Sequence, residues 1–132
     1  MTTIAPEGLD RLRDTFTPEA IERLVTAFYE RVRSDPLLGP IFEARVADWP
    51  RHLSRMCAFW GTILRAEAGY RANHRGSPLQ IHQAIEGLTD DHWERWLELF
   101  ERTACEVFEQ WAADEAVGRA RRIAVALAGS RA

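Results

Sequence analysis

Long hydrophobic runs are missing from this sequence. No apolar stretch approaches the roughly 20 residues needed to span a bilayer, and the first residues lack the uninterrupted apolar segment of a signal peptide. These absences predict a cytoplasmic chain with no membrane partner. Strong positive charge is missing as well, because the net charge is −3 and the pI is near 5.8. A nucleic-acid partner needs a clustered basic surface and is therefore not expected.

Cysteine is scarce, and the metal-binding motifs that depend on it are absent. Cys57 and Cys105 lie among apolar helical positions without C-x-x-C spacing, so we interpret both as reduced core thiols, with a structural disulfide as the alternative. A zinc site needs more cysteines or histidines paired at helical spacing, and His-Glu-x-x-His does not occur. No histidine has a glutamate three residues before it, which excludes the Glu-x-x-His pairs of a di-iron bundle.

What is present is the composition of one folded domain. The 132 residues suit a single domain over residues 1–132, in which residues 1–16 form an N-terminal extension or a short helix. Apolar residues make up 46% of the chain and charged residues 28%, close to the average for globular proteins. The chain is therefore expected to fold around one buried core.

Hydrophobic spacing predicts helices along most of the chain. Thr17 and Pro18 form a helix start, with the threonine as N-cap and the proline at the first helical position. Residues 34–36 end this helix, because a proline disfavours helical backbone in the residue before it. The apolar stretch 37–42 contains glycine and proline and is predicted to form a short buried corner, with Phe42 pointing inward.

Further helix signals follow this corner. Asp48 can cap a helix that carries His52 on its apolar face, and residues 66–76 then interrupt the pattern as a loop. The stretch 77–80 reads Ser-Pro-Leu-Gln, which fits a capping box. It is predicted to open a short helix with His82 on its apolar side.

The C-terminal part of the chain predicts two helices. Thr89 caps the longest predicted helix, whose apolar positions repeat at helical spacing as far as Trp111. Asp114 and Glu115 are expected to start the last helix, which ends near Gly129. No segment alternates with a period of two, so the fold class is predicted to be all-α.

Four polar or amphipathic side chains lie on apolar helical stripes: Tyr29, His52, His82 and Trp96. A buried imidazole without a partner costs about 1–3 kcal/mol, so each histidine needs a hydrogen bond, a metal or a ligand. Hydrogen-bonded core residues would account for each of them singly. Their joint occurrence on separate helices favours a large apolar cofactor, and haem would bind one neutral imidazole and present a ligand on its other face.

The same residues resemble those of a known family, the truncated haemoglobins, and within it the third group. The resemblance runs from about Ile21 to the last helix, and its motifs follow one another in the family's order. The motifs are Phe28-Tyr29 with Leu38-Gly39-Pro40-Ile41-Phe42, Trp49-Pro50-Arg51-His52 with Phe59-Trp60, Pro78-Leu79-x-x-His82, and Trp96-Leu97-x-Leu99-Phe100. The resemblance implies a truncated globin fold, a two-over-two helical sandwich around haem b.

The resemblance also implies roles for individual residues. His82 is implied as the iron ligand, and Tyr29, His52 and Trp96 as the lining of the pocket on the opposite, distal side of the haem. Side chains expected to pack around the porphyrin are Phe42, Met56, Phe59, Trp60 and Trp93. Candidates to hold the haem propionates are Tyr70, Arg71, His74 and Arg75, although a solvated basic turn is the competing interpretation of this loop.

A polar distal pocket implies strong retention of O2. Ferrous haem shifts negative charge onto O2, and tyrosine, tryptophan and histidine donors would hold that charge with bonds of roughly 1.5–3 kcal/mol each. Slow release favours redox detoxification of nitric oxide or peroxide, with an external electron donor, over transport. The alternative is a non-enzymatic O2 carrier or a haem-based sensor of O2, NO or CO. A helical interaction module without a cofactor is the remaining alternative.

Overall fold

The computed structural model describes residues 6–65 and 88–129, and within these residues every regular element is a helix. This confirms the all-α fold class. The helices are α1 (Pro6–Thr15), α2 (Pro18–Ser34), α3 (Gly39–Arg45), α4 (Trp49–Arg65), α6 (Asp90–Val107) and α7 (Gln110–Gly129).

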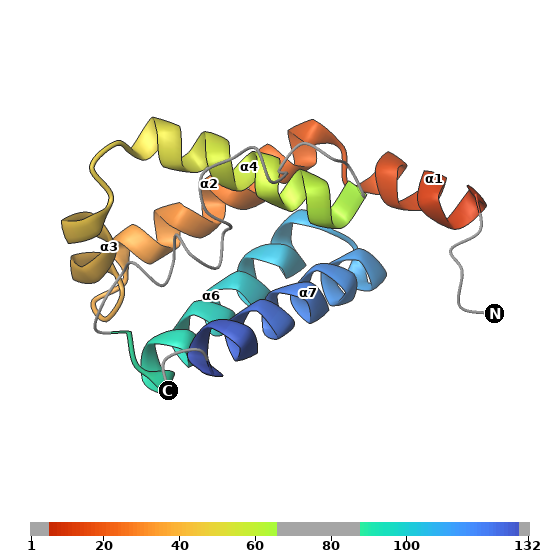
Figure 1. The fold of residues 1–132 in the computed structure, drawn as a ribbon. Coiled ribbons are helices and arrows are strands. Elements are labelled where there is room, and N and C mark those ends of the chain that lie inside the picture. Colours follow the sequence, from red (N-terminus) through yellow and green to blue (C-terminus); the bar gives the residue numbers. More distant parts are fainter. Residues whose placement is uncertain (1–5, 66–87, 130–132) are drawn as a thin grey trace.

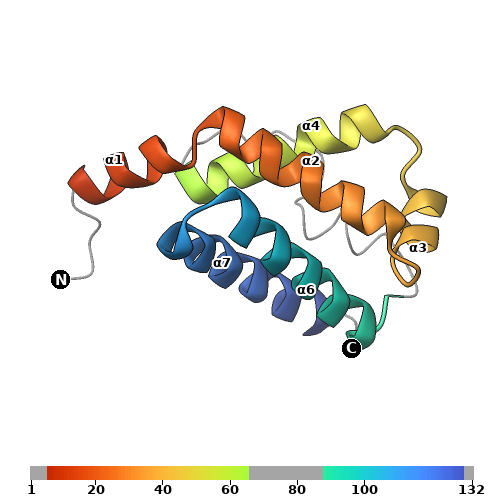
Figure 2. The same cartoon turned by 180° about the vertical axis from the view of Figure 1, so that it is seen from behind.

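The long helices form two layers, as Figures 1 and 2 show from opposite sides. Helices α2 and α4 pack together in one layer, α6 and α7 pack together in the other, and α2 also lies across α6. Helix α1 extends to one side of this sandwich and contacts the end of α4, where the Arg65 guanidinium donates to the carbonyls of Arg13 and Phe16. The arrangement is the predicted two-over-two sandwich.

Three of the predicted helix starts have the expected caps, at Thr17, Asp48 and Thr89. The Oγ1 atom of Thr17 accepts a hydrogen bond from the Ala20 N–H at 3.1 Å, and Pro18 occupies the first turn, where its missing N–H costs nothing. At α6, Thr89 is the N-cap, and the imidazole of His92 accepts from the Thr89 N–H at 2.8 Å. The N-terminal residues 6–15 form the short helix that the sequence left open.

The predicted corner at residues 37–42 is wrong in one respect, because most of it belongs to a short helix. Pro40 lies in the first turn of α3, where its fixed φ starts a helix instead of breaking one. Gly39 is required there, since a Cβ atom at this position would lie 2.6 Å from the carbonyl oxygen of Arg33. Phe42 is buried as predicted, whereas Leu37 is 42% exposed.

The predicted boundary between the last two helices is also wrong. Helix α6 ends at Val107 and α7 begins at Gln110, four residues before the predicted start at Asp114. Phe108 has extended backbone angles and turns the chain between them. The apolar spacing continues across this turn because Phe108 is buried and Trp111 half-buried, so hydrophobic periodicity alone does not reveal the break.

The core lies between the two layers and is rich in aromatic rings. Its largest fully buried side chains include Phe16, Phe28, Tyr29, Phe42 and Phe100. The prediction for the cysteines is half correct: both thiols are free, and Cys57 is half-buried, but Cys105 is exposed instead of buried in the core. Its place on the outer side of α6 follows from the helical period, since the adjacent Ala104 faces inward.

Candidate functional site

Tyr29 and His52 are brought together from different helices of one layer. Tyr29 lies in the middle of α2 and His52 in the first turn of α4, which begins after Asp48 accepts a hydrogen bond from the Arg51 N–H. Their ring centroids are 4.9 Å apart and the rings meet edge to face, at 86°. Trp49 contacts both rings, with its centroid 5.9 Å from Tyr29 and 5.5 Å from His52.

Trp96 reaches the same region from the other layer. Phe28 links the two sides, because its ring centroid lies 4.9 Å from Tyr29 and 5.5 Å from Trp96. Phe100, one turn along α6, stacks between Trp96 at 5.8 Å and Trp60 of α4 at 4.9 Å. The three predicted distal residues therefore belong to one continuous aromatic cluster that joins α2, α4 and α6.

Two buried nitrogen atoms of this cluster have no hydrogen-bond partner among residues 6–65 and 88–129. These are Nε2 of His52 and Nε1 of Trp96, on side chains of residues only 8% and 2% exposed. Nothing among the described residues accepts from or donates to either atom. Each such atom costs about 1–3 kcal/mol relative to a satisfied one, so a purely structural core would not retain two of them on facing helices.

Burial determines the protonation of both titratable side chains. Desolvation, with a smaller contribution from the charge of Arg55, lowers the pKa of His52 from 6.5 to about 4, so its imidazole is neutral at neutral pH. Desolvation raises the pKa of Tyr29 above its ordinary value of 10.0, so its phenol keeps its proton. The region thus offers a phenol O–H, an indole N–H and a neutral imidazole.

The other predicted pocket residues divide into two sets. Those expected around the porphyrin are all buried: Phe42, Met56, Phe59, Trp60 and Trp93. Those in the predicted loop and the predicted short helix lie outside the described residues: Tyr70, Arg71, His74, Arg75 and His82. The structure therefore shows where Tyr29, His52 and Trp96 lie, and their distal roles, like the assignment of His82 as iron ligand, stay predictions.

Comparison with known proteins identifies the family. The model of the bacterial-like globins matches residues 17–128 of this chain. A group 3 truncated haemoglobin from Campylobacter jejuni is 32% identical over 115 residues, which cover 84% of this chain and 87% of that protein. The chain belongs to the bacterial-like globins, within the group III truncated haemoglobins.

The crystal structure of a group III truncated haemoglobin from Campylobacter jejuni supports the assignment of this chain to the group III truncated haemoglobins. The two structures superpose with a TM-score of 0.77 at 30% identity, over 89% of this chain and 92% of the other. Family membership implies that this globin binds haem and small gaseous ligands. No helix in its described residues has the length and apolarity to cross a membrane.

The described residues fit a haem group. The orphaned Nε2 of His52 and Nε1 of Trp96 are nitrogen atoms to which a small polar ligand on the cofactor could bond, which would remove their desolvation cost. The buried rings of Phe42 and Phe59 offer apolar contacts of the kind that a porphyrin plate needs. Residues 6–65 and 88–129 therefore contain the chemistry expected of the distal half of a globin pocket.

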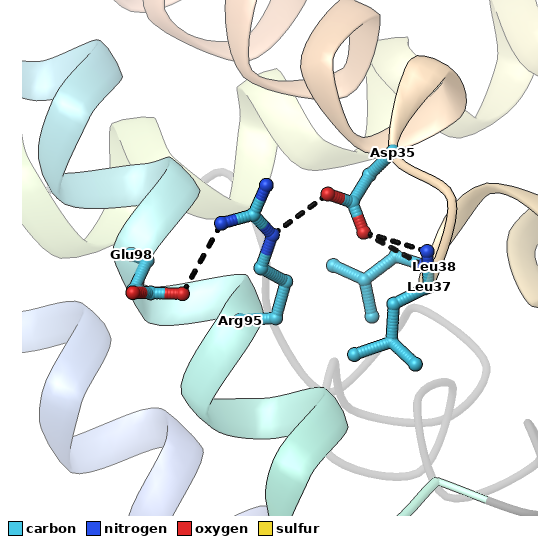
Figure 3. A network of polar contacts seen from close by, with 5 residues as sticks. All are labelled: Asp35, Leu37, Leu38, Arg95 and Glu98. Carbon is cyan, nitrogen blue, oxygen red and sulfur yellow. Dashed lines mark hydrogen bonds and ion pairs between the residues drawn. The ribbon is translucent and has the colours of Figure 1, made fainter.

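Sequence reasoning missed the contacts of three residues that build this region: Trp49, Asp35 and Arg95. Trp49 was read as part of a motif and not as a contact of Tyr29 and His52. Asp35 was read only as part of a helix stop, yet its buried carboxylate joins the end of α2 to Arg95 of α6, one residue before Trp96 (Figure 3). The signal for Asp35 was the Asp-Pro pair itself, because a buried aspartate after a helix commonly bonds the following backbone N–H groups.

A groove on the surface is lined by residues outside this aromatic cluster. A groove of about 460 Å3 between α2 and α4 is lined by Pro18, Glu19, Glu22, Thr26, Pro50, Leu53, Ser54 and Cys57. None of these residues was predicted to contact haem. Burial, followed by the charge of Glu22, raises the pKa of the Cys57 thiol, so this cysteine is not an activated nucleophile.

Proposed function

We propose that this globin binds haem b through His82 and uses its distal pocket for redox detoxification of nitric oxide or peroxide. The observation that carries the proposal is that two buried nitrogen atoms, on His52 beside the Tyr29 ring and on Trp96, have no partner in the part of the chain that the structure describes. Haem iron, when bound, supplies reversible binding of diatomic ligands and one-electron chemistry. The proximal role of His82 rests on the family resemblance.

Each distal side chain has a distinct capacity. The Trp96 indole can only donate, so its Nε1–H stabilises negative charge on a ligand without competing for a proton. The Tyr29 phenol keeps its proton and can donate as well. Burial keeps the His52 imidazole neutral and makes it a weak base at neutral pH, so its Nε2 is suited to a hydrogen bond with a ligand and only in a lesser degree to accepting a proton from peroxide.

Two hydrogen-bond donors that converge on bound O2 favour its retention over its release for transport. Bonds to a charged group contribute roughly 1.5–3 kcal/mol each, so two of them would slow ligand release by at least two orders of magnitude. Turnover then needs an external electron donor, because no flavin or nicotinamide domain is recognisable in the 132 residues. We infer that a separate reductase or small reductant supplies the electrons.

Rapid mixing of the ferrous, O2-saturated protein with nitric oxide tests this function. The proposal expects nitrate as product and a rate far above that of free nitric oxide with dissolved O2. Slow oxidation, with peroxide also left unconsumed, would instead favour the carrier or sensor. A separate test of the cofactor site is His82→Ala, for which we expect loss or weak retention of haem. An unchanged ferrous spectrum and unchanged haem retention in that variant would show that another residue is the ligand.

A further inference from the structure

The ends of three helices meet beside His52. Arg33 lies in the last turn of α2, Glu43 lies in α3, and Trp49 opens α4. Figures 1 and 2 both show these helix ends at the same end of the molecule. Gly39 permits this meeting, because it lets the start of α3 approach the backbone of Arg33 closely.

The side chains at this junction form a chain of contacts that leads from solvent to the pocket. The Nε of Arg33 donates to Oε1 of Glu43 at 2.8 Å. The same guanidinium lies over the ring of Trp49, with its Cζ atom 4.4 Å from the ring centroid. Trp49 in turn meets the ring of His52 edge to face, at 5.5 Å and 86°.

Exposure changes sharply along this chain. The side chains of Arg33 and Glu43 are 44% and 47% exposed, Trp49 is half-buried, and His52 is 8% exposed. His52 also lies in the first turn of α4, next to the exposed residues Pro50 and Arg51, so rotation of its side chain is the movement that would carry the imidazole from the buried position toward solvent. The Trp49 ring contacts both the Arg33 guanidinium and the His52 imidazole. Because the guanidinium holds the Trp49 ring in place, that ring restricts the rotation of His52.

We propose that the Arg33–Trp49 contact is a latch that keeps the His52 ring inside the pocket and thereby sets how fast a diatomic ligand reaches it. This inference rests on the proposed function, since it assumes that ligands pass His52. Arg33 and Trp49 act as positioning residues, and Glu43 orients the guanidinium of Arg33. A solvent-exposed cation over an aromatic ring is a weak contact, so its loss should change the population with the His52 ring rotated out of the pocket by about two- to fivefold.

The first test is the association rate of CO with the ferrous, haem-loaded protein. Arg33→Gln removes the cation and should accelerate association about two- to fivefold, whereas Arg33→Lys keeps a cation near the ring and should restore a rate close to that of the wild type. Arg11→Gln is the matched control, because Arg11 lies 3.9 Å over the ring of Trp111 at the α1–α7 contact. An equal acceleration in the control would overturn the latch.

A second readout does not involve the haem. Diethyl pyrocarbonate modifies accessible imidazoles, and mass spectrometry measures the rate at each histidine separately. The latch predicts that Arg33→Gln speeds modification of His52 by a similar factor and leaves His92 unchanged. Equal rates at His52 in wild type and variant would overturn the proposal, since the imidazole would then be no more accessible without the cation.

Ionic strength supplies an independent measurement. CO is uncharged, so added salt should affect its association only through charges of the protein, of which the exposed Arg33–Glu43 pair is one. We expect association to accelerate with salt in the wild type. In Glu43→Gln, CO association should be faster than in the wild type at low salt and should accelerate less as salt is added. An equal salt response in the two proteins would contradict the role of Glu43.

The variant His52→Leu separates failure of the latch from failure of the proposed pocket. Acceleration in His52→Leu together with wild-type rates in Arg33→Gln would overturn the latch and leave the pocket role intact. No change in either variant would also remove the role of His52 in ligand access. In the His52→Leu background, Arg33→Gln should add nothing, and a full additive effect would show that Arg33 acts by another route.

Discussion

Two regions of this globin bury polar side chains, and they do so in opposite ways. At the α2–α3 junction, Asp35 is almost completely buried, and its carboxylate accepts from the N–H groups of Leu37 and Leu38 and from the Arg95 guanidinium (Figure 3). In the aromatic cluster, Nε2 of His52 and Nε1 of Trp96 are equally buried and have no partner among the described residues. The three residues are similarly buried, with Asp35 5%, His52 8% and Trp96 2% exposed, so the difference does not come from their depth in the fold.

The contrast separates stability from ligand binding. A buried polar group with all its bonds formed holds elements together, and the Asp35 network fixes the end of α2 to α6 near Trp96. A buried polar group without partners destabilises the protein until a ligand arrives. We therefore expect substitutions at Asp35 to reduce stability, and substitutions at Trp96 to change ligand release while stability stays nearly constant.

The largest expected effect is on O2 release at the unsatisfied site. Trp96→Phe deletes the N–H and keeps a ring, so O2 dissociation should accelerate about 10- to 100-fold, corresponding to roughly 1.5–3 kcal/mol. Tyr29→Phe should act in the same direction, and the two effects should not add, because both donors would meet one ligand. Stopped-flow displacement of O2 by CO measures the rates.

Unfolding of the same variants provides the control. Trp96→Phe should change the free energy of unfolding by less than about 1 kcal/mol, since the loss of ring volume is offset by removal of an unsatisfied donor. Release rates within about twofold of the wild type in both single variants would mean that these side chains are core packing, and the redox proposal would lose its main support.

The next largest effect is expected at the satisfied site. Asp35→Ala leaves the buried Leu38 N–H without its acceptor and removes the partner of Arg95, so the free energy of unfolding should fall by about 2–3 kcal/mol. The Arg95 side chain is one-third exposed and can be solvated, which keeps the loss below that of a fully buried pair. Urea unfolding measures it, and a loss under about 0.5 kcal/mol would contradict the contrast.

Arg95→Met should have a smaller effect than Asp35→Ala. The two backbone N–H groups still bond the Asp35 carboxylate, and methionine preserves much of the apolar stem of the arginine. We expect a loss of about 1–2 kcal/mol in urea unfolding, with O2 release changed less than in Trp96→Phe. A larger effect on O2 release than on stability would show that Arg95 orients the neighbouring indole and does more than join two helices.

The sequence predicted the polar stripe residues better than the contacts between them. Tyr29, His52 and Trp96 were recognisable because each interrupts an apolar face with 3.6-residue spacing, and that spacing depends on local sequence alone. The contacts of Trp49 with Arg33 and Tyr29 join residues from different helices. Such contacts depend on how α2, α3 and α4 pack, and no local pattern encodes that packing.

The errors in the fold have a similar origin. The turn at Phe108 contains neither glycine nor proline, so nothing local distinguishes it from continuous helix. At Gly39 and Pro40 the opposite happened, because residues that commonly end helices here start one beside the backbone of Arg33. Cys105 lies between apolar positions in sequence but on the solvent side of α6, since helical residues one apart lie about 100° apart.

The smallest expected effect is a dependence of stability on pH. His52 and Asp35 should each contribute to it in a different pH range. Burial lowers the pKa of His52 from 6.5 to about 4, so between these values the unfolded chain binds a proton that the folded chain does not. Stability therefore falls as the pH falls through this window. Because the protonated ring can rotate into solvent, the loss should be limited to about 1 kcal/mol, the strength of the contacts that hold it inside.

Asp35 should affect stability at lower pH than His52, and for a different physical reason. Burial alone would raise its pKa, but the hydrogen bonds from Leu38, Arg95 and Leu37 lower the pKa below 3.8. The stability it contributes is therefore present above its unfolded pKa and disappears as the pH falls through the folded pKa. Urea unfolding of the haem-loaded protein from about pH 7 to about pH 3 should show two separable losses. His52→Leu should remove only the loss at higher pH, and Asp35→Asn only the loss at lower pH. A variant that removes the other loss instead would contradict the assignment of that group.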